Sequence, residues 1–268
     1  MSERVDFYGA YRQFTDGLPG QIRRETFGED IGQNSWLTVD EYDRFIGWLA
    51  LEPGHDVLEV ASGSGGPALH LTRTTGCRVI GIDSNASGVA TASRLAADAR
   101  LGERARFVEA DAGTALPFES EAFDAILCID AMNHLPERAA VLAEWRRLLR
   151  PGGRALFTDP VVITGPVRND ELALRSSIGV FLFVPPGVNE RLVEEAGLHL
   201  ARVEDVTENA AMVSERWHRA RVAHRDALVA SEGAERFEGV QRFLESVHRL
   251  TRERRLSRIA YLLERKAG

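Results

Sequence analysis

A glycine-rich turn beside acidic residues is the first place where the residue types and spacing of this chain predict ligand chemistry. An apolar run over 56–60 is followed by Gly63 and Gly65, and Asp83 ends the next apolar run. Glycines let a backbone approach a ligand closely, and a helix that starts at such a turn offers unpaired N–H groups. Asp83 can accept hydrogen bonds from ribose hydroxyls. The pattern therefore predicts a nucleotide site.

Two further side chains have the types and positions needed for proton transfer. His134 lies just past an apolar run over 122–130, and Asp159 ends another apolar run over 154–160. Histidine is a common general base because its pKa lies near neutrality, and an aspartate can hold it in one tautomer. A hydroxyl nucleophile needs such a base because it must lose its proton as the new bond forms. These residues predict general-base chemistry.

Two ligand classes fit the glycine-rich turn. Gly63, Gly65 and Ala68 satisfy the dinucleotide pattern G-x-G-x-x-G/A, with Asp83 at the ribose position. The second class is S-adenosylmethionine, because the run that begins at Glu59 and ends at Gly65 resembles the first motif of the class I methyltransferases. That motif is an acidic residue followed by three alternating glycines. A nicotinamide enzyme is the alternative at this point.

The order of later segments favours the methyltransferase resemblance. Residues 106–112 resemble the family's third strand with its acidic end, and residues 116–118 resemble the LPF sequence that leads into the fourth strand. Residues 122–130 resemble the fourth strand, and residues 149–153 resemble the proline–glycine turn before the fifth. Ala61 occupies the first glycine position of the first motif and is a departure from the family pattern.

The resemblance implies an α/β fold with a doubly wound, mostly parallel seven-stranded sheet of the Rossmann-like type, whose seventh strand is antiparallel. It also implies S-adenosylmethionine as cofactor and S-adenosylhomocysteine as product. In this family Asp111 would meet the adenine amino group, and Ile129 is expected to line the adenine pocket. The residues that the resemblance places at the cofactor are Glu59, Ala61, Gly63, Gly65, Asp83, Ser84, Asp111, Ala112 and Ile129.

The acceptor chemistry is predicted from strands four and five. These strands are neighbours in the implied fold, so His134 and Asp159 emerge at one sheet edge and are expected to meet as a catalytic pair. The arrangement resembles the sugar O-methyltransferases of natural-product pathways. Asp159-Pro160 also resembles a motif of the sarcosine/dimethylglycine N-methyltransferases, where His134 would only orient the substrate. Asp130 is a candidate for binding a substrate cation or capping the next turn.

Alternating helical and strand patterns position these residues, which implies a parallel sheet covered on both faces. We expect four parts: an N-terminal lid segment, a cofactor-binding core, a helical insertion that also forms a lid, and a final core strand. Their ranges are 1–38, 39–209, 210–256 and 257–268. Strands are expected at 56–62, 78–83, 106–112, 122–130, 154–160, 198–206 and 257–264, and helices at 39–51, 85–101, 136–150, 188–196, 212–229 and 237–250.

Aromatic residues are the candidate lid contacts. Trp36 is expected to contact cofactor or substrate, with Gln33 and Ser35 as neighbouring candidates, and Phe181 is expected to form an apolar substrate wall. Packing between lid and core is the alternative for each aromatic residue. Tyr8 and Tyr11, on an expected N-terminal helix, are assigned to packing.

Composition limits the partners. The 268 residues carry a formal net charge of −7, which argues against a nucleic-acid partner. Cys77 and Cys128 form no C-x-x-C pair, so we expect no metal site. No signal-peptide pattern and no run of membrane-spanning length is present, so we expect a cytoplasmic protein without a membrane partner. A small-molecule acceptor is the expected partner, and a homodimer is left open.

The function that we expect is methyl transfer to a hydroxyl of a natural-product-type metabolite. One alternative is an N-methyltransferase of a small amine or amino acid. The other is a cofactor-binding regulatory protein without turnover, since a fold alone does not fix a function.

Overall fold

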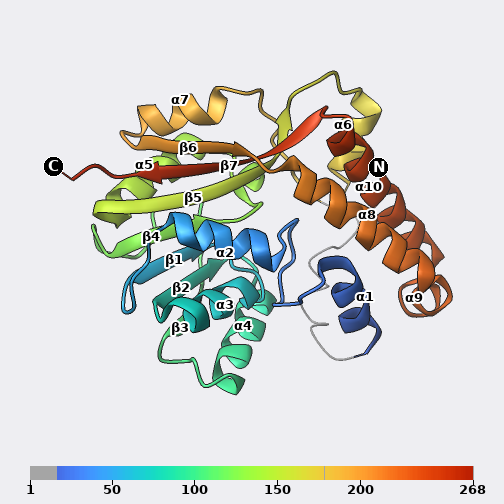
Figure 1. Ribbon diagram of the computed structural model, residues 1–268, viewed down its shortest axis with the longest axis horizontal. Coiled ribbons are helices and arrows are strands. Elements are labelled where there is room, and N and C mark those ends of the chain that lie inside the picture. The colour runs from blue at the N-terminus through green and yellow to red at the C-terminus, as the bar shows by residue number, and fades with distance from the viewer. Residues whose placement is uncertain (1–16, 178, 268) are drawn as a thin grey trace.

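A seven-stranded mixed sheet forms the centre of the part of the chain that the structure describes (Figure 1). The computed structural model describes residues 17–177 and 179–267, so Tyr8 and Tyr11 lie outside the described residues. The strand order is β3-β2-β1-β4-β5-β7-β6, and β7 runs antiparallel to both of its neighbours. The strands are β1 (Asp56–Val60), β2 (Arg78–Asp83), β3 (Ala105–Glu109), β4 (Phe123–Cys128), β5 (Leu149–Ile163), β6 (His199–Asp205) and β7 (Leu256–Glu264). The predicted fold class is confirmed.

Helices cover both faces of the sheet, as the alternating patterns predict. Side chains of successive strand residues point to opposite faces, so β1 places Val57 in one apolar cluster and Leu58 in another. The Val57 face packs against α2 (Val39–Trp48) and α3 (Gly66–Thr75). The Leu58 face packs against α5 (Arg138–Leu148) and α7 (Val188–Glu195), while α4 (Ala86–Asp98) lies against β2 and β3. Burial on both faces explains why the central strands are apolar throughout.

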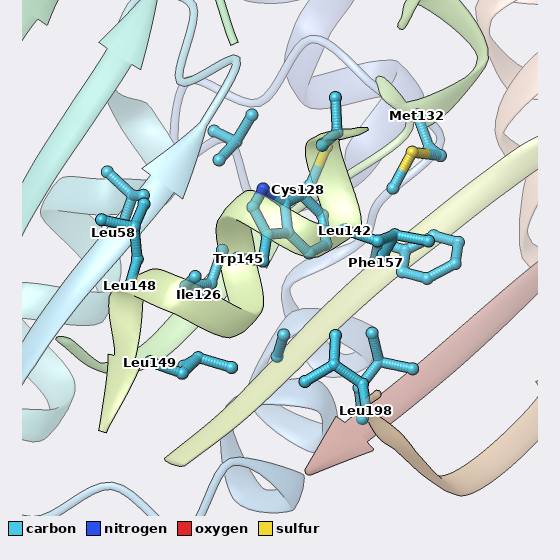
Figure 2. Packing of buried hydrophobic residues seen from close by; sticks show 14 of the residues in the cluster. Leu58, Ile126, Cys128, Met132, Leu142, Trp145, Leu148, Leu149, Phe157 and Leu198 are labelled. Carbon is cyan, nitrogen blue, oxygen red and sulfur yellow. The ribbon is translucent and has the colours of Figure 1, made fainter. Parts of the chain in front are cut away.

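Trp145 of α5 is a central residue of the second face (Figure 2). It is 1% exposed, and its ring centre lies 6.1 Å from that of Phe157 on β5. Phe157 in turn stacks on Tyr261 of β7 at 4.6 Å. Aromatic side chains bury large apolar areas, so this row of rings packs α5 against β5 and β7.

A helical layer lies beyond one end of the sheet, on the right in Figure 1. It consists of α1 (Leu18–Phe27), α6 (Asn169–Arg175), α8 (Thr207–Ala223), α9 (Arg225–Glu232) and α10 (Ala234–Arg252). Phe27, Trp36, Val213 and Phe243 belong to one apolar cluster of this layer. The helices of the insertion therefore share a core with the N-terminal segment. None of the described helices has the length and apolar character needed to cross a membrane.

Two local expectations were wrong. The helix expected over 212–229 is two helices, because His224 leaves helical geometry with φ −109° and ψ 24° between α8 and α9. The turn expected over 149–153 is the beginning of β5, which pairs with β4 through an irregular register between Phe123 and Ala125. Gly152 adopts a positive φ of 83° there, so the glycine serves a strand irregularity.

Candidate functional site

A cavity of about 440 Å³ opens at the carboxyl ends of β1, β2, β3 and β4. This edge is where open α/β sheets bind their ligands. The N-terminal segment and the helical layer contribute the opposite wall through Trp36, Trp217 and Phe243. Of the predicted site residues, those that line the cavity are Ser35, Trp36, Ala61, Asp83, Ser84, Asp111, Ala112, Ile129, Asp130, His134 and Phe181.

The glycine-rich turn is compressed between neighbouring elements. Gly65 has a φ of 80°, and a Cβ there would lie 2.7 Å from both Ala92 of α4 and Phe107 of β3. A Cβ on Gly66 would lie 2.1 Å from the carbonyl oxygen of Ile31. Gly65 itself does not line the cavity, so its direct contact with a cofactor stays a prediction. These glycines are required for close packing around the turn.

Asp83 holds the turn in place. Its two carboxylate oxygens accept hydrogen bonds from the backbone N–H groups of Gly63 and Asn85, each at 2.8 Å. Asn85 caps α4 as predicted, because its side chain accepts from the N–H of Gly88 at 3.0 Å. A carboxylate has about four lone-pair sites, so Asp83 retains acceptor capacity at the cavity wall.

Glu59 is buried beneath this turn without lining the cavity. It is 5% exposed, and no hydrogen-bond donor among the described residues reaches its Oε2. Burial, with a smaller contribution from the negative charge of Asp83, raises the pKa of Glu59 to about 8. An ionised carboxylate without a donor would carry an unmet desolvation cost at this buried position, which is why the carboxyl group keeps its proton.

Replacing Glu59 by glutamine is expected to remove a pH dependence from the free energy of unfolding. The folded chain keeps this proton up to about pH 8, whereas an unfolded glutamate releases it near 4.5. The contribution of protonated Glu59 is thus fully present below about pH 4.5 and is lost as the pH rises through 8. Urea titrations measure the free energy of unfolding at each pH. Between about pH 5 and pH 9, this free energy should fall by on the order of 3 kcal/mol more in the wild type than in Glu59→Gln. Equal losses would show that Glu59 does not retain its proton.

His134 ends a 3-10 turn over Met132–His134 that follows β4. Its Nδ1 lies 2.7 Å from the carbonyl oxygen of Val180, and because a carbonyl only accepts, Nδ1 carries the hydrogen. Nε2 is therefore an acceptor, and the side-chain amide of Asn133 donates to it at 3.2 Å. Burial lowers the pKa of His134, and the positive charge of Arg175 lowers it further. The imidazole is thus neutral near pH 7, with Nε2 able to accept a proton.

The expected pairing of His134 with Asp159 was wrong. Asp159 is fully buried, and its Oδ2 accepts hydrogen bonds from Arg138 at 2.7 Å and from Asn189 at 3.0 Å. Its Oδ1 accepts from the backbone N–H of Val161 at 3.2 Å. The carboxylate is committed to a buried ion pair behind the cavity wall. The Val180 carbonyl orients His134 in its place.

Asp130 is also committed to partners within the chain. Its Oδ1 accepts from Thr158 and from Arg258 of β7, both at 2.7 Å, and its Oδ2 accepts from the backbone N–H of Trp36 at 2.9 Å. Arg258 also pairs with Glu41 of α2 at 2.6 Å. Binding of a substrate cation by Asp130 therefore stays a prediction. Asp130 ties the segment around Trp36 to the sheet.

Arg175, the last residue of α6, is a site residue that sequence reasoning missed. It lines the cavity and is only 2% exposed. It lies in a proline- and glycine-punctuated stretch, and no motif or spacing in the sequence marks it. Gln33, predicted as a cavity contact, is instead buried as a brace of its own loop, where its Oε1 accepts from the N–H of Ile31 at 2.9 Å.

Comparison with known proteins finds similarity to methyltransferases. A family profile described as a methyltransferase domain matches residues 57–153. The chain is 28% identical over 205 residues to the 27-O-demethylrifamycin SV methyltransferase of Amycolatopsis mediterranei, and the match covers 75% of each protein. It is 35% identical over 178 residues to the methyltransferase GfsG of Streptomyces halstedii, covering 64% of this chain and 61% of that protein.

A solved structure shows the same arrangement of elements. The cyclopropane synthase MmaA2 from Mycobacterium tuberculosis aligns with a TM-score of 0.81 and 17% identity, covering 98% of this chain and all of that one. At this level of identity, the likeness shows a shared fold alone.

Proposed function

We propose that this chain is a class I S-adenosylmethionine-dependent methyltransferase that methylates a hydroxyl group of a small molecule, with His134 as general base. The matches to a methyltransferase domain and to two methyltransferases support the class. The observation that carries the proposal is the tautomer of His134. Its Nδ1 hydrogen is held by Val180, which leaves the Nε2 lone pair as the proton acceptor beside the cavity. The relative that acts on 27-O-demethylrifamycin SV is named for an acceptor that lacks a methyl group on oxygen.

The residues around the glycine-rich turn fit S-adenosylmethionine. Asp83 and Asp111 line the cavity wall, and their carboxylates suit the ribose hydroxyls and the adenine amino group. When bound, the cofactor supplies an electrophilic methyl group with its leaving group already attached. The chain then has to align the acceptor, exclude water and take up one proton.

His134 would take up that proton at Nε2. An acceptor hydroxyl would replace the Asn133 amide as the donor to Nε2, since the 3.2 Å contact with that amide is a long hydrogen bond. The proton would move from the hydroxyl to Nε2 as the oxygen–carbon bond forms and the carbon–sulfur bond of the methyl donor breaks, and the imidazolium would keep its Nδ1 hydrogen on Val180. The neighbouring ring of Phe181, whose centre lies 4.7 Å from that of His134, packs edge-on against the imidazole.

The pH profile of kcat/KM should report this base. Because burial and Arg175 lower the pKa of His134 from 6.5, the proton-accepting form is dominant above that value and is lost as the pH falls through the lowered pKa. We expect the acid limb of the profile to lie below pH 6.5 and the rate to be level at neutral pH. An acid limb above neutrality would assign the profile to another group.

A screen with a radiolabelled methyl donor tests the proposal. Hydroxyl and amine acceptors of matched skeleton would be presented to the full chain, after calorimetric confirmation that S-adenosylmethionine and S-adenosylhomocysteine bind. Transfer to hydroxyls supports the proposal. Transfer confined to amines would support N-methylation, where His134 only orients the substrate, and cofactor binding without any transfer would support a regulatory role.

A further inference from the structure

Arg175 is placed in the cavity by a well-anchored helix. Glu171, one turn earlier in α6, is 2% exposed and accepts hydrogen bonds from Arg255 and Arg249 of the C-terminal elements. It also accepts from the backbone N–H of Arg168 at 3.0 Å, which caps the helix. Because three groups fix Glu171, the position of Arg175 at the other end of the helix is defined.

The Arg175 guanidinium is enclosed by aromatic rings. Its Cζ lies 4.7 Å from the ring centre of Phe181, 5.2 Å from that of Phe243 and 5.8 Å from that of Trp36. Aromatic faces stabilise a cation but accept no strong hydrogen bonds. Among the described residues, the buried Nη1 has no hydrogen-bond partner. The rings therefore hold the guanidinium while leaving N–H donors for a ligand.

No carboxylate of the described residues forms a salt bridge with Arg175. Its acidic neighbours are Asp130 and Asp159, and these already pair with Arg258 and Arg138, each at 2.7 Å. Burial lowers the pKa of Arg175 to about 10, which still leaves it charged at neutral pH. A buried cation without a paired anion is strongly unfavourable unless a ligand supplies the anion.

Arg175 lies beside the proposed base. Phe181 contacts both residues, since its ring centre is 4.7 Å from the His134 ring and 4.7 Å from the guanidinium carbon. All three residues line the same cavity. An anion on Arg175 and a reacting group at His134 can therefore belong to one small molecule.

We propose that the acceptor carries a carboxylate, which Arg175 binds while the group to be methylated lies at His134. The guanidinium matches a carboxylate because its planar N–H donors can form two parallel hydrogen bonds. Arg175 is the one Arg or Lys in the described lining of the cavity, which also contains Asp83, Asp111 and Asp130. Arg258 already pairs with Asp130, whereas no described residue forms a salt bridge with Asp83 or Asp111. A single cation beside these two acids suits a singly charged carboxylate better than a doubly charged phosphate. The placement of the group to be methylated at His134 rests on the proposed function.

Binding to the full chain saturated with S-adenosylhomocysteine tests the carboxylate site without requiring turnover. Acetate, benzoate and 3-phenylpropionate would be titrated calorimetrically, each beside its neutral amide and with phenyl phosphate as the anion of higher charge. We expect a carboxylate to bind and its amide not to bind. Arg175→Met should weaken carboxylate binding by roughly 10²-fold, Arg175→Lys by less, and Arg191→Met, which removes an exposed charge on α7, should have no effect.

Three results would overturn the proposal. Equal binding of carboxylates and amides, or no binding of either, removes the carboxylate site even if Arg175→Met fails to fold, because this comparison uses the wild type. Tighter binding of phenyl phosphate than of any carboxylate would show that the site binds a phosphate group instead. Weaker binding of S-adenosylhomocysteine to Arg175→Met, in proportion to the carboxylate loss, assigns Arg175 to the cofactor's own carboxylate.

Failure of the proposed function gives a different result. Carboxylate binding that depends on Arg175, with no methyl transfer to any hydroxy acid, would support the carboxylate site and contradict the hydroxyl mechanism. Transfer to neutral hydroxyl acceptors that Arg175→Met leaves unchanged would retain the mechanism and remove the carboxylate site.

Discussion

Replacing His134 by alanine is expected to lower kcat by roughly 10² to 10⁴ at neutral pH while leaving the affinity for S-adenosylhomocysteine unchanged. The loss follows from removing the Nε2 acceptor that the Val180 hydrogen bond prepares. Without it, the acceptor hydroxyl must lose its proton to solvent. The rate of the alanine variant should therefore rise with pH where that of the wild type is level. Single-turnover rates across the pH range measure both effects.

A matched variant separates the loss of a base from the loss of any histidine. His70 lies on α3 and pairs with Asp43 at 2.7 Å, away from the cavity lining. His70→Ala should retain wild-type turnover and its pH profile. Near-normal turnover of His134→Ala at neutral pH would exclude His134 as the base and leave it an orienting role.

Replacing Arg258 by methionine is expected to lower the free energy of unfolding by about 3–5 kcal/mol. The side chain is fully buried and pairs with Asp130 at 2.7 Å and Glu41 at 2.6 Å. Removing the guanidinium leaves two buried carboxylates, those of Asp130 and Glu41, without their cationic partner. Burial already raises the pKa of Glu41 despite the opposing effect of Arg258, so the cost should shrink as the pH falls and Glu41 becomes protonated. Urea unfolding at two pH values measures both quantities.

An exposed arginine on the same part of the chain provides the control. Arg254 pairs with Asp205 at 2.7 Å, and both side chains are about half exposed. Arg254→Met should cost less than about 1 kcal/mol, because exposed ion pairs contribute little. Adding Glu41→Gln to Arg258→Met should recover part of the lost stability. A cost for Arg258→Met no larger than that for Arg254→Met would mean that the buried network does not stabilise the fold.

The fold could be predicted from the sequence because its determinants are local. The apolar run 56–60, the glycines after it and the acidic ends of later strands each depend on neighbours within a few residues. The ordered motifs then fixed the topology. The expected helix 212–229 was wrong because its break at His224 has no proline or glycine to mark it. The start of β5 was missed because Pro151 and Gly152 read as a turn.

The side-chain partners at the site were less predictable because they come from distant parts of the chain. The topology brought His134 and Asp159 to one sheet edge, but it did not reveal that Arg138 and Asn189 hold Asp159. The acceptor for His134 is a backbone carbonyl, which carries no residue-type signal. Arg175 escaped notice for the same reason, because its role depends on rings gathered from three other segments.

The place of β7 in the sheet has a consequence for how the protein is made on the ribosome. Within the described sheet β6 pairs only with β7, so its hydrogen bonds to the sheet cannot form until β7 has been synthesised. The same strand carries Arg258, whose contact with Glu41 spans 217 residues of sequence. The part of the cavity at the ends of β1 to β4 can form early. The opposite wall, from the N-terminal segment and the helical layer, is held in place only after β7 has paired. Nascent chains should therefore acquire cofactor affinity well before they can exclude water around a bound acceptor.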